Sequence, residues 1–259
     1  KNMLEEIPEH CKVVKAKNPI ITNKEFDLLV NLRYKGFSTQ VLPMLFNVKE
    51  GKKGLEKAIK ELCLKAEQAV DAGYNYIVLS DRGVNKDLAP IPSLLAISAV
   101  HHYLIDTRKR MQIDLVVESG EPREIMHFAL LFGYGANLVN PYLAFALIEN
   151  QIAEGNLKLD FETAEKHYVK AVKKGLLKVL SKMGISTLRS YRGAQIFEAI
   201  GLNSSVLQKY FTGTNSKIEG ADIGDIANDA IVSHQRGFSS EELTNPLTEH
   251  AGVYAFRKK

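Results

Sequence analysis

The chain has few cysteines, and none stands in a pattern that binds metal. Its 259 residues include two, Cys11 and Cys63, which lie far apart and form no C-x-x-C pair. Structural zinc sites and disulfide frameworks need closely spaced or paired cysteines. The sequence therefore predicts neither, and it favours a reducing, cytoplasmic location.

Long apolar runs and charge of one sign are also missing. No run approaches the ~18 to 20 apolar residues that cross a bilayer, and the opening "KNMLEEIPEHCK" lacks the apolar core of a signal peptide. The 34 basic residues are scattered among 30 acidic ones, for a net charge of +4. Because nucleic-acid and membrane surfaces usually show a concentrated basic patch, we expect neither partner. The charged ends and the first residue, Lys1, suggest a piece of a longer chain.

Apolar runs do occur, but they are short and regularly placed. Between Tyr76 and Ala144 the runs "YIVLS", "IDLVVES" and "ANLVN" are each followed by a polar turn and a helix-like segment. Such continuous runs are typical of parallel strands covered on both faces. Upstream, "TQVLPMLFNV" is a further strand-like run, in which Pro43 predicts an edge, an end or a bulge. Strands that alternate with single helices predict a parallel sheet.

Helical periodicity is clearest in "GKKGLEKAIKELCLKAEQAVDAG", which Gly73 closes. Its apolar side chains recur at i, i+3, i+4 spacing: Leu55, Ile59, Leu62, Ala66, Ala69 and Val70. Beyond Gly155 the strands give way to a long amphipathic stretch, 161–183, and shorter helices. We therefore predict an α/β fold, an incomplete or degenerate (β/α) barrel-like parallel sheet with a helical C-terminal portion.

We expect a single domain, 1–259, made of four parts. Residues 1–38 form a lead-in, where "EFDLLVNL" is compatible with a helix or a strand. Residues 39–155 form the βα-repeat core and 156–236 the helical portion. Residues 237–259 form a polar, linker-like tail.

Candidate site residues follow the predicted strands, because parallel α/β folds bind ligands at the carboxyl ends of their strands. They are Asp81, Arg82, Glu118, Glu121, Arg123 and Asn140. These groups could bind an anion or supply an acid and a base. Alternatively, "SDRG" is a turn and "ESGEPRE" caps a helix, which we favour. Arg189 and Arg192 could form a second anion site, but a surface docked against another domain is the interpretation that we favour.

A phosphate-binding barrel usually offers glycine-rich backbone at two successive strand ends. This chain has only Gly120 at the first and Pro141, which lacks an N–H, at the second. Adjacent histidines, His101 and His102, point about 100° apart on a helix and cannot share a metal. No serine stands in a G-x-S-x-G elbow. We therefore predict no catalytic, cofactor-binding or metal-binding residue.

Several long motifs resemble a known family, and they extend over about residues 47–238. They are "IVLSDRG", "APIPSLLA", "AVHHYL", "LVVESGEPRE", "HFALLFGYGANLVNPYLA", "KAVKKGLLKVLSKMGISTLRSYRGAQIFEAIGL" and "KYFTGT". The chain resembles the central domain of the large subunit of glutamate synthase. The resemblance implies a multidomain enzyme of glutamate biosynthesis and ammonia assimilation, which makes two glutamate from glutamine, 2-oxoglutarate and reductant.

In that family, an amidotransferase domain with an N-terminal cysteine releases ammonia, and a tunnel carries it to an FMN barrel with an iron-sulfur cluster. A β-helix completes the subunit. This chain begins with Lys1 and its Cys11 is internal, so it lacks the glutaminase nucleophile. Two cysteines cannot hold the family's three-cysteine cluster. The resemblance thus implies a relative of the FMN barrel without its cofactor.

Our leading hypothesis is a non-catalytic scaffold that contacts the glutaminase and FMN-binding domains of its own subunit and helps form the ammonia tunnel. FMN and the iron-sulfur cluster then belong to neighbouring domains. One alternative is an autonomous barrel enzyme with an anion site around Glu118, Arg123 and Asn140. Another is a separately encoded binding module that assembles with other glutamate synthase subunits.

Overall fold

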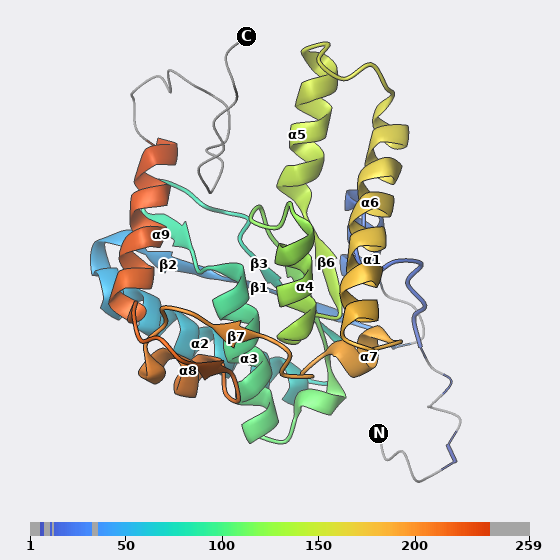
Figure 1. Cartoon of the computed structure of the whole chain (residues 1–259). Helices are drawn as coiled ribbons and strands as arrows, with labels where there is room; N and C mark the ends of the chain where they lie inside the picture. The colour runs from blue at the N-terminus through green and yellow to red at the C-terminus, as the bar shows by residue number, and fades with distance from the viewer. Residues whose placement is uncertain (1–5, 8–10, 12, 33–35, 239–259) are drawn as a thin grey trace.

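The computed structural model describes residues 6, 7, 11, 13–32 and 36–238 (Figure 1). Its helices and strands are, in order, α1 (Asn23–Val30), β1 (Thr39–Pro43), β2 (Leu45–Asn47), α2 (Gly51–Asp71), β3 (Tyr76–Ser80), β4 (Leu88–Pro90), α3 (Ser93–Asp106), β5 (Asp114–Glu118), α4 (Ile125–Gly133), β6 (Leu138–Asn140), α5 (Tyr142–Ala153), α6 (Phe161–Lys182), α7 (Leu188–Tyr191), β7 (Glu198–Ala199), α8 (Ser204–Tyr210), β8 (Asn215–Ser216) and α9 (Ile223–Phe238). Short 3-10 turns occupy Val48–Glu50 and Arg110–Gln112.

A parallel sheet in the order β1-β3-β5-β6 forms the centre of the fold (Figure 1). The helices α2, α3, α4 and α5 follow these strands along the chain, so the βα unit occurs four times. Within the described residues the sheet has four strands and does not close into a barrel. The predicted α/β fold with an incomplete, barrel-like parallel sheet is confirmed.

Helices cover the sheet on both faces. Ile77 and Leu79 of β3 point into a large core shared with α2, α3 and α4. The alternate residues Tyr76 and Val78 enter a smaller core with α1. All of β3 is buried, as its uninterrupted apolar run predicted.

The described part of the lead-in contains one helix, α1, and also pairs with the sheet. Thr22 and Glu25 form a capping box: Glu25 N donates to Thr22 Oγ1 at 3.2 Å, and Thr22 N donates to the Glu25 carboxylate at 2.9 Å. This cap explains why "EFDLLVNL" forms a helix rather than a strand. Just before it, Val139 N donates to Pro19 O and Ile21 N donates to Val139 O, both at 2.9 Å. The lead-in therefore pairs with the outer edge of β6.

Pro43 ends β1, which is an edge strand of the sheet, in agreement with the prediction. The chain then leaves the sheet, and β2 pairs antiparallel with β4. The sequence did not predict this small second sheet. Helix α2 has the predicted buried face, formed by Leu55, Ile59, Leu62, Ala66, Ala69 and Val70.

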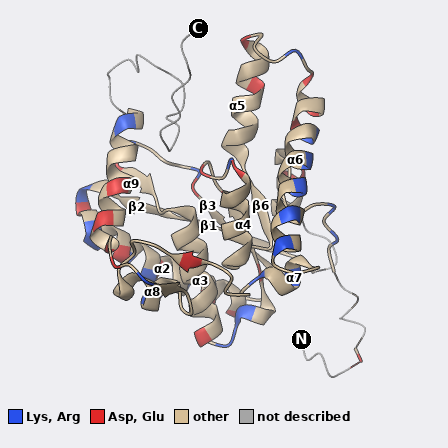
Figure 2. Cartoon of the chain, in the orientation of Figure 1, with Lys and Arg blue, Asp and Glu red and all other residues tan. Residues whose placement is uncertain are grey.

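Helices α5 and α6 pack against each other and extend beyond the sheet (Figure 1). The N-cap of α6 is Asp160, whose carboxylate accepts a hydrogen bond from Thr163 N at 2.9 Å. Lysines line much of the exposed side of α6 (Figure 2). The predicted long helix at 161–183 is present as α6, which ends at Lys182.

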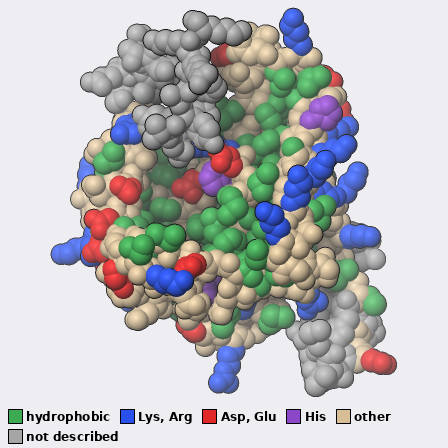
Figure 3. All heavy atoms as spheres, in the orientation of Figure 1, with side chains coloured by type: hydrophobic (Ala, Val, Ile, Leu, Met, Phe, Trp, Pro, Cys, Tyr) green, Lys and Arg blue, Asp and Glu red, His purple; other side chains and the backbone are tan. Residues whose placement is uncertain are grey.

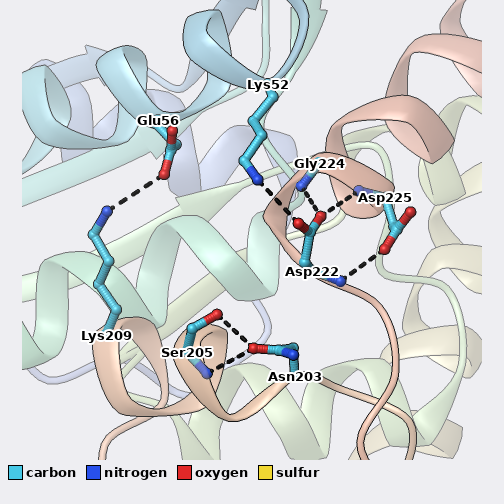
Figure 4. Close-up of polar contacts among 8 residues, drawn as sticks. All are labelled: Lys52, Glu56, Asn203, Ser205, Lys209, Asp222, Gly224 and Asp225. Atoms are coloured by element: carbon cyan, nitrogen blue, oxygen red, sulfur yellow. Dashed lines mark hydrogen bonds and ion pairs between the residues drawn. The ribbon is translucent and has the colours of Figure 1, made fainter.

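The C-terminal helices pack back onto α2. Lys52 of α2 forms an ion pair with Asp222 at 2.9 Å, and Asp222 also accepts a hydrogen bond from Asp225 N at the start of α9 (Figure 4). Glu56 pairs with Lys209 of α8 at 3.6 Å (Figure 4). This portion also holds the two-residue parallel pair β7–β8, which the sequence did not predict. The last helix continues to Phe238, and the rest of the predicted tail lies outside the described residues.

Candidate functional site

Polar side chains from three neighbouring strands meet at the carboxyl edge of the sheet. Asp81 follows β3, Glu118 ends β5 and Asn140 ends β6, and the register pairs Glu118 with both Ser80 and Asn140. Asp81, Glu118 and Asn140 are 4%, 5% and 0% exposed. Buried polar groups need hydrogen-bond partners, so their partners determine what this edge can bind.

Glu118 is bound by two groups of its own chain. Its carboxylate accepts hydrogen bonds from Ser80 Oγ at 2.5 Å and from Arg82 Nε at 2.8 Å. The Arg82 guanidinium also lies 3.8 Å above the ring of Tyr142, a cation–π contact. The Arg82 side chain is 55% exposed, so this pair forms the outer rim of the edge.

Asp81 is bound in the same way. Its Oδ2 accepts hydrogen bonds from Ser119 Oγ at 2.7 Å and from Gly120 N at 2.9 Å. Its Oδ1 is buried and has no hydrogen-bond partner among the described residues. Burial first, and the Asp81 carboxylate second, raise the pKa of Tyr142 well above its usual range. Tyr142 therefore stays a neutral phenol at physiological pH.

Asn140 joins the edge of the sheet to the lead-in. Its Nδ2 donates hydrogen bonds to Ile21 O at 3.1 Å and to Asn23 Oδ1 at 3.0 Å. Its buried Oδ1 has no partner within the described residues. The amide group thus anchors the start of α1 beside β6.

Glu121 caps the N-terminus of helix α3. Its carboxylate accepts hydrogen bonds from Ser93 N at 2.8 Å and Ser93 Oγ at 2.5 Å. Ser93 is the first residue of α3, where free N–H groups and the helix dipole favour a negative charge. Glu121 therefore supplies the cap that Pro92, the residue before α3, cannot provide.

Arg123 precedes α4 and lies apart from the two buried carboxylates. Its carbonyl accepts a hydrogen bond from Tyr168 at 3.0 Å, and it shares the lining of a cavity of about 320 Å³ with Glu121. Among the described residues no hydrogen bond joins Arg123 to Glu118 or Asn140. The anion site around these three residues stays a prediction.

Arg189 and Arg192 lie near the opposite edge of the sheet. Both act on Asp114, the first residue of β5: burial raises the pKa of Asp114, and the charges of Arg192, Arg110 and Arg189 oppose this rise. Burial lowers the pKa of Arg192. Between the two arginines, Tyr191 is buried and donates to Ala129 O at 3.1 Å. These contacts lie within the chain, and the docking against another domain that we favoured for this segment stays a prediction.

The sequence did not reveal a buried polar cluster at this amino edge. Arg110, 8% exposed, donates hydrogen bonds to His101 Nδ1, Ile113 O and Gly135 O at 2.8 Å and to Asn137 Oδ1 at 3.1 Å. Burial, then Arg110, His102 and Arg192, lower the pKa of His101 to about 3. Nothing near Arg110 in the sequence distinguishes it from its basic neighbours, because its partners come from separate segments.

A flavin or sugar phosphate does not fit the carboxyl edge. The Gly120 N–H, which such a group would need, already binds Asp81. Pro141 has no N–H to offer at the next strand end, and Glu118, which pairs with Asn140 in the sheet, adds a second carboxylate to this edge. Negative groups that hold the available donors would repel a phosphate.

Metal ligands and reactive thiols are the remaining candidates for chemistry within the described residues. No group of three or more His, Cys, Asp and Glu side chains could hold a metal ion there. Cys63 is buried, which raises the pKa of its thiol to about 12 and makes it a poor nucleophile. None of the described helices combines the length and apolar character needed to cross a membrane.

Comparisons with known proteins show one family consistently. The glutamate synthase central domain model matches residues 1–203. The NADPH glutamate synthase large chain of Bacillus subtilis is 40% identical over 240 residues, covering 93% of this chain and 16% of the relative. The NADH glutamate synthase of Schizosaccharomyces pombe is 42% identical over 95% of this chain and 12% of the relative. The ferredoxin-dependent glutamate synthase of Pyropia yezoensis is 36% identical over 97% of this chain and 17% of the relative.

The chain thus spans less than a fifth of the length of these curated relatives. Among solved structures, a mutant flavocytochrome b2 with benzoylformate aligns with 56% of this chain and 38% of its own, at a TM-score of 0.44 and 12% identity. That similarity is too low to support an argument about fold or ligand. The sequence matches are decisive by themselves, and the chain belongs to the glutamate synthase central domain family.

Proposed function

We propose that this chain is a non-catalytic scaffold within a glutamate synthase, which makes two glutamate from glutamine, 2-oxoglutarate and reductant. It contacts the glutaminase and FMN-binding domains of its own subunit and helps form the tunnel that carries ammonia between them. FMN and the iron-sulfur cluster belong to the neighbouring domains. We place the enzyme in the cytoplasm.

One observation carries the proposal: at the carboxyl edge of the sheet, where parallel α/β folds bind ligands, the carboxylates of the chain itself hold the hydrogen-bond donors of the neighbouring loops. The Glu118 and Asp81 carboxylates hold Ser80, Arg82, Ser119 and the Gly120 N–H. These groups position loops instead of presenting donors to a substrate. The relatives, each several times longer than this chain, support a role beside other domains.

Flavin binding by the purified chain tests the proposal. We expect FMN fluorescence to be unchanged when the chain is added at up to about 100 µM, because no phosphate site is available. The same titration with inorganic phosphate, followed by NMR, tests the alternative anion site at Glu118, Arg123 and Asn140. Saturable quenching of FMN at micromolar concentration would refute the scaffold role.

A second test uses the natural full-length subunit. Arg82 is half exposed at the rim, and the substitution Arg82→Glu places a repelling charge beside Glu118. We expect glutamine-dependent glutamate synthesis to fall several-fold while synthesis from added ammonia is retained, because only the coupling between domains is disturbed. Lys60→Glu, on the exposed side of α2, is the matched control. Equal loss of both activities would place Arg82 in the reaction itself.

A further inference from the structure

A cavity of about 530 Å³ lies beside α9, between this helix and the segment that leads from β4 into α3. Its walls are mostly apolar: Val84, Pro90, Pro92, Ile226, Ala230 and Phe238. Figure 3 shows this side of the molecule hollowed, with hydrophobic side chains around acidic and histidine side chains. The volume is that of a site for a small organic group.

The charge in this cavity has one sign. Two carboxylates, Glu121 and Asp229, contribute to its lining, and among the described residues no Lys or Arg does. Glu121 is partly engaged by Ser93, whereas Asp229 is exposed and takes part in no ion pair found among the described residues. Carboxylates beside an apolar wall attract a cation and exclude an anion.

An exposed aromatic ring, that of Phe238, adds to the preference for a cation. Phe238 is 43% exposed at the cavity, and its ring lies 4.7 Å from that of His234. The face of such a ring attracts organic cations. His234 is 8% exposed and its Nε2 donates to Asn85 O at 2.6 Å. Its Nδ1 is buried and has no hydrogen-bond partner among the described residues.

We propose that this cavity is a binding site for an organic cation: a guanidinium, amidinium or ammonium group carried on an apolar body. The apolar body occupies the wall formed by Pro90, Pro92 and Ile226. The positive group faces Asp229 and Glu121. The site adjoins the carboxyl edge, where the Asp81 charge acts on Glu121, but neither Asp81 nor Glu118 lines it, and it does not depend on the scaffold role.

Three probes of the same shape and different charge test the site. The ¹⁵N-labelled chain is titrated with benzamidine, neutral benzamide and anionic benzoate while its NMR spectrum is recorded. We expect saturable shifts at Ala230 and His234 with benzamidine, at least about fivefold weaker binding of benzamide, and none of benzoate. Equal binding of the three probes, no binding of benzamidine, or shifts confined to other elements would overturn the proposal.

Substitutions on the exposed side of α9 give an independent check. Asp229→Asn should weaken benzamidine binding about two- to fivefold, the scale of one exposed ion pair. Ser233→Phe should fill the cavity and remove binding. Asp106→Asn, at the far end of α3, makes the same charge change as a control. Circular dichroism confirms folding, and retained binding in Ser233→Phe or an equal loss in Asp106→Asn would contradict the site.

A peptide probe distinguishes the two sources of such a cation. The blocked peptide Ac-Ala-Phe-Arg-Ala-NH₂ presents an arginine beside an aromatic ring, as a partner protein would. Binding at least about tenfold tighter than benzamidine indicates a protein side chain as the natural occupant. Binding of benzamidine without the peptide indicates a small molecule.

Discussion

The substitution His101→Asn should make the stability of the fold less sensitive to acid. His101 is buried against Arg110, which donates a hydrogen bond to its Nδ1 at 2.8 Å. Burial, with the charges of Arg110, His102 and Arg192, lowers the pKa of His101 to about 3. Asparagine keeps an acceptor near the position of Nδ1 but does not titrate.

The sign and size follow from proton linkage. The unfolded chain binds a proton at this histidine below about pH 6.5, and the folded chain does so only near pH 3. The contribution of neutral His101 to the free energy of unfolding is therefore fully present above pH 6.5, and it is lost as the pH falls toward 3. The loss is about 1.4 kcal/mol per pH unit, or on the order of 2 kcal/mol between pH 6.5 and pH 4.5.

Urea unfolding at these two pH values measures the effect. The chain has no Trp but 10 Tyr, so tyrosine fluorescence and circular dichroism are the signals. The carboxylates titrate in both proteins, and comparing the wild type with His101→Asn cancels their contribution. The exposed His167 serves as control through His167→Asn. An identical fall in the free energy of unfolding for the wild type and His101→Asn would refute the reasoning.

Three further predictions follow from local geometry. Gly135→Ala should cost about 2 kcal/mol or more in a thermal melt, because Gly135 has φ +122° and an added Cβ would lie 2.5 Å from the His101 ring; an unchanged melting temperature would contradict this. Asp160→Ala should cost about 1 kcal/mol through the lost N-cap of α6, and retention of stability would show that this helix start is held otherwise. Ellman's reagent at pH 8 should label the exposed Cys11 quickly and the buried Cys63 only on unfolding; two fast thiols would show that the core opens.

The sequence predicted those elements whose pattern is local. The buried face of α2 follows from apolar side chains at helical spacing, and the buried strand β3 from a continuous apolar run. Pro43 indicated an edge, an end or a bulge because proline has no N–H to donate to a strand ladder, and it both ends β1 and lies on an edge strand. The sheet partner of β2 could not be predicted in this way, since β4 lies about forty residues away and only tertiary packing joins them.

The sequence predicted where the candidate site residues lie but not which hydrogen bonds they form. Asp81, Glu118 and Asn140 do share the carboxyl edge, as the alternation of strands and helices implied. Which donor each carboxylate holds depends on rotamers and on distant segments, such as the lead-in that binds Asn140. The Arg110 cluster shows the same limit, because its acceptors come from several segments that only the fold brings together.

The pairing of Pro19 and Ile21 with Val139 limits how far the chain can be truncated from its N-terminus. A shortened protein that starts near Thr39 would keep every strand of the parallel sheet. It would nevertheless leave the outer backbone of β6 unpaired, and it would remove Phe26 and Leu29 from the smaller core that they form with β3. Bare strand edges template association between copies, so residues 19–30 protect this edge of the sheet from aggregation.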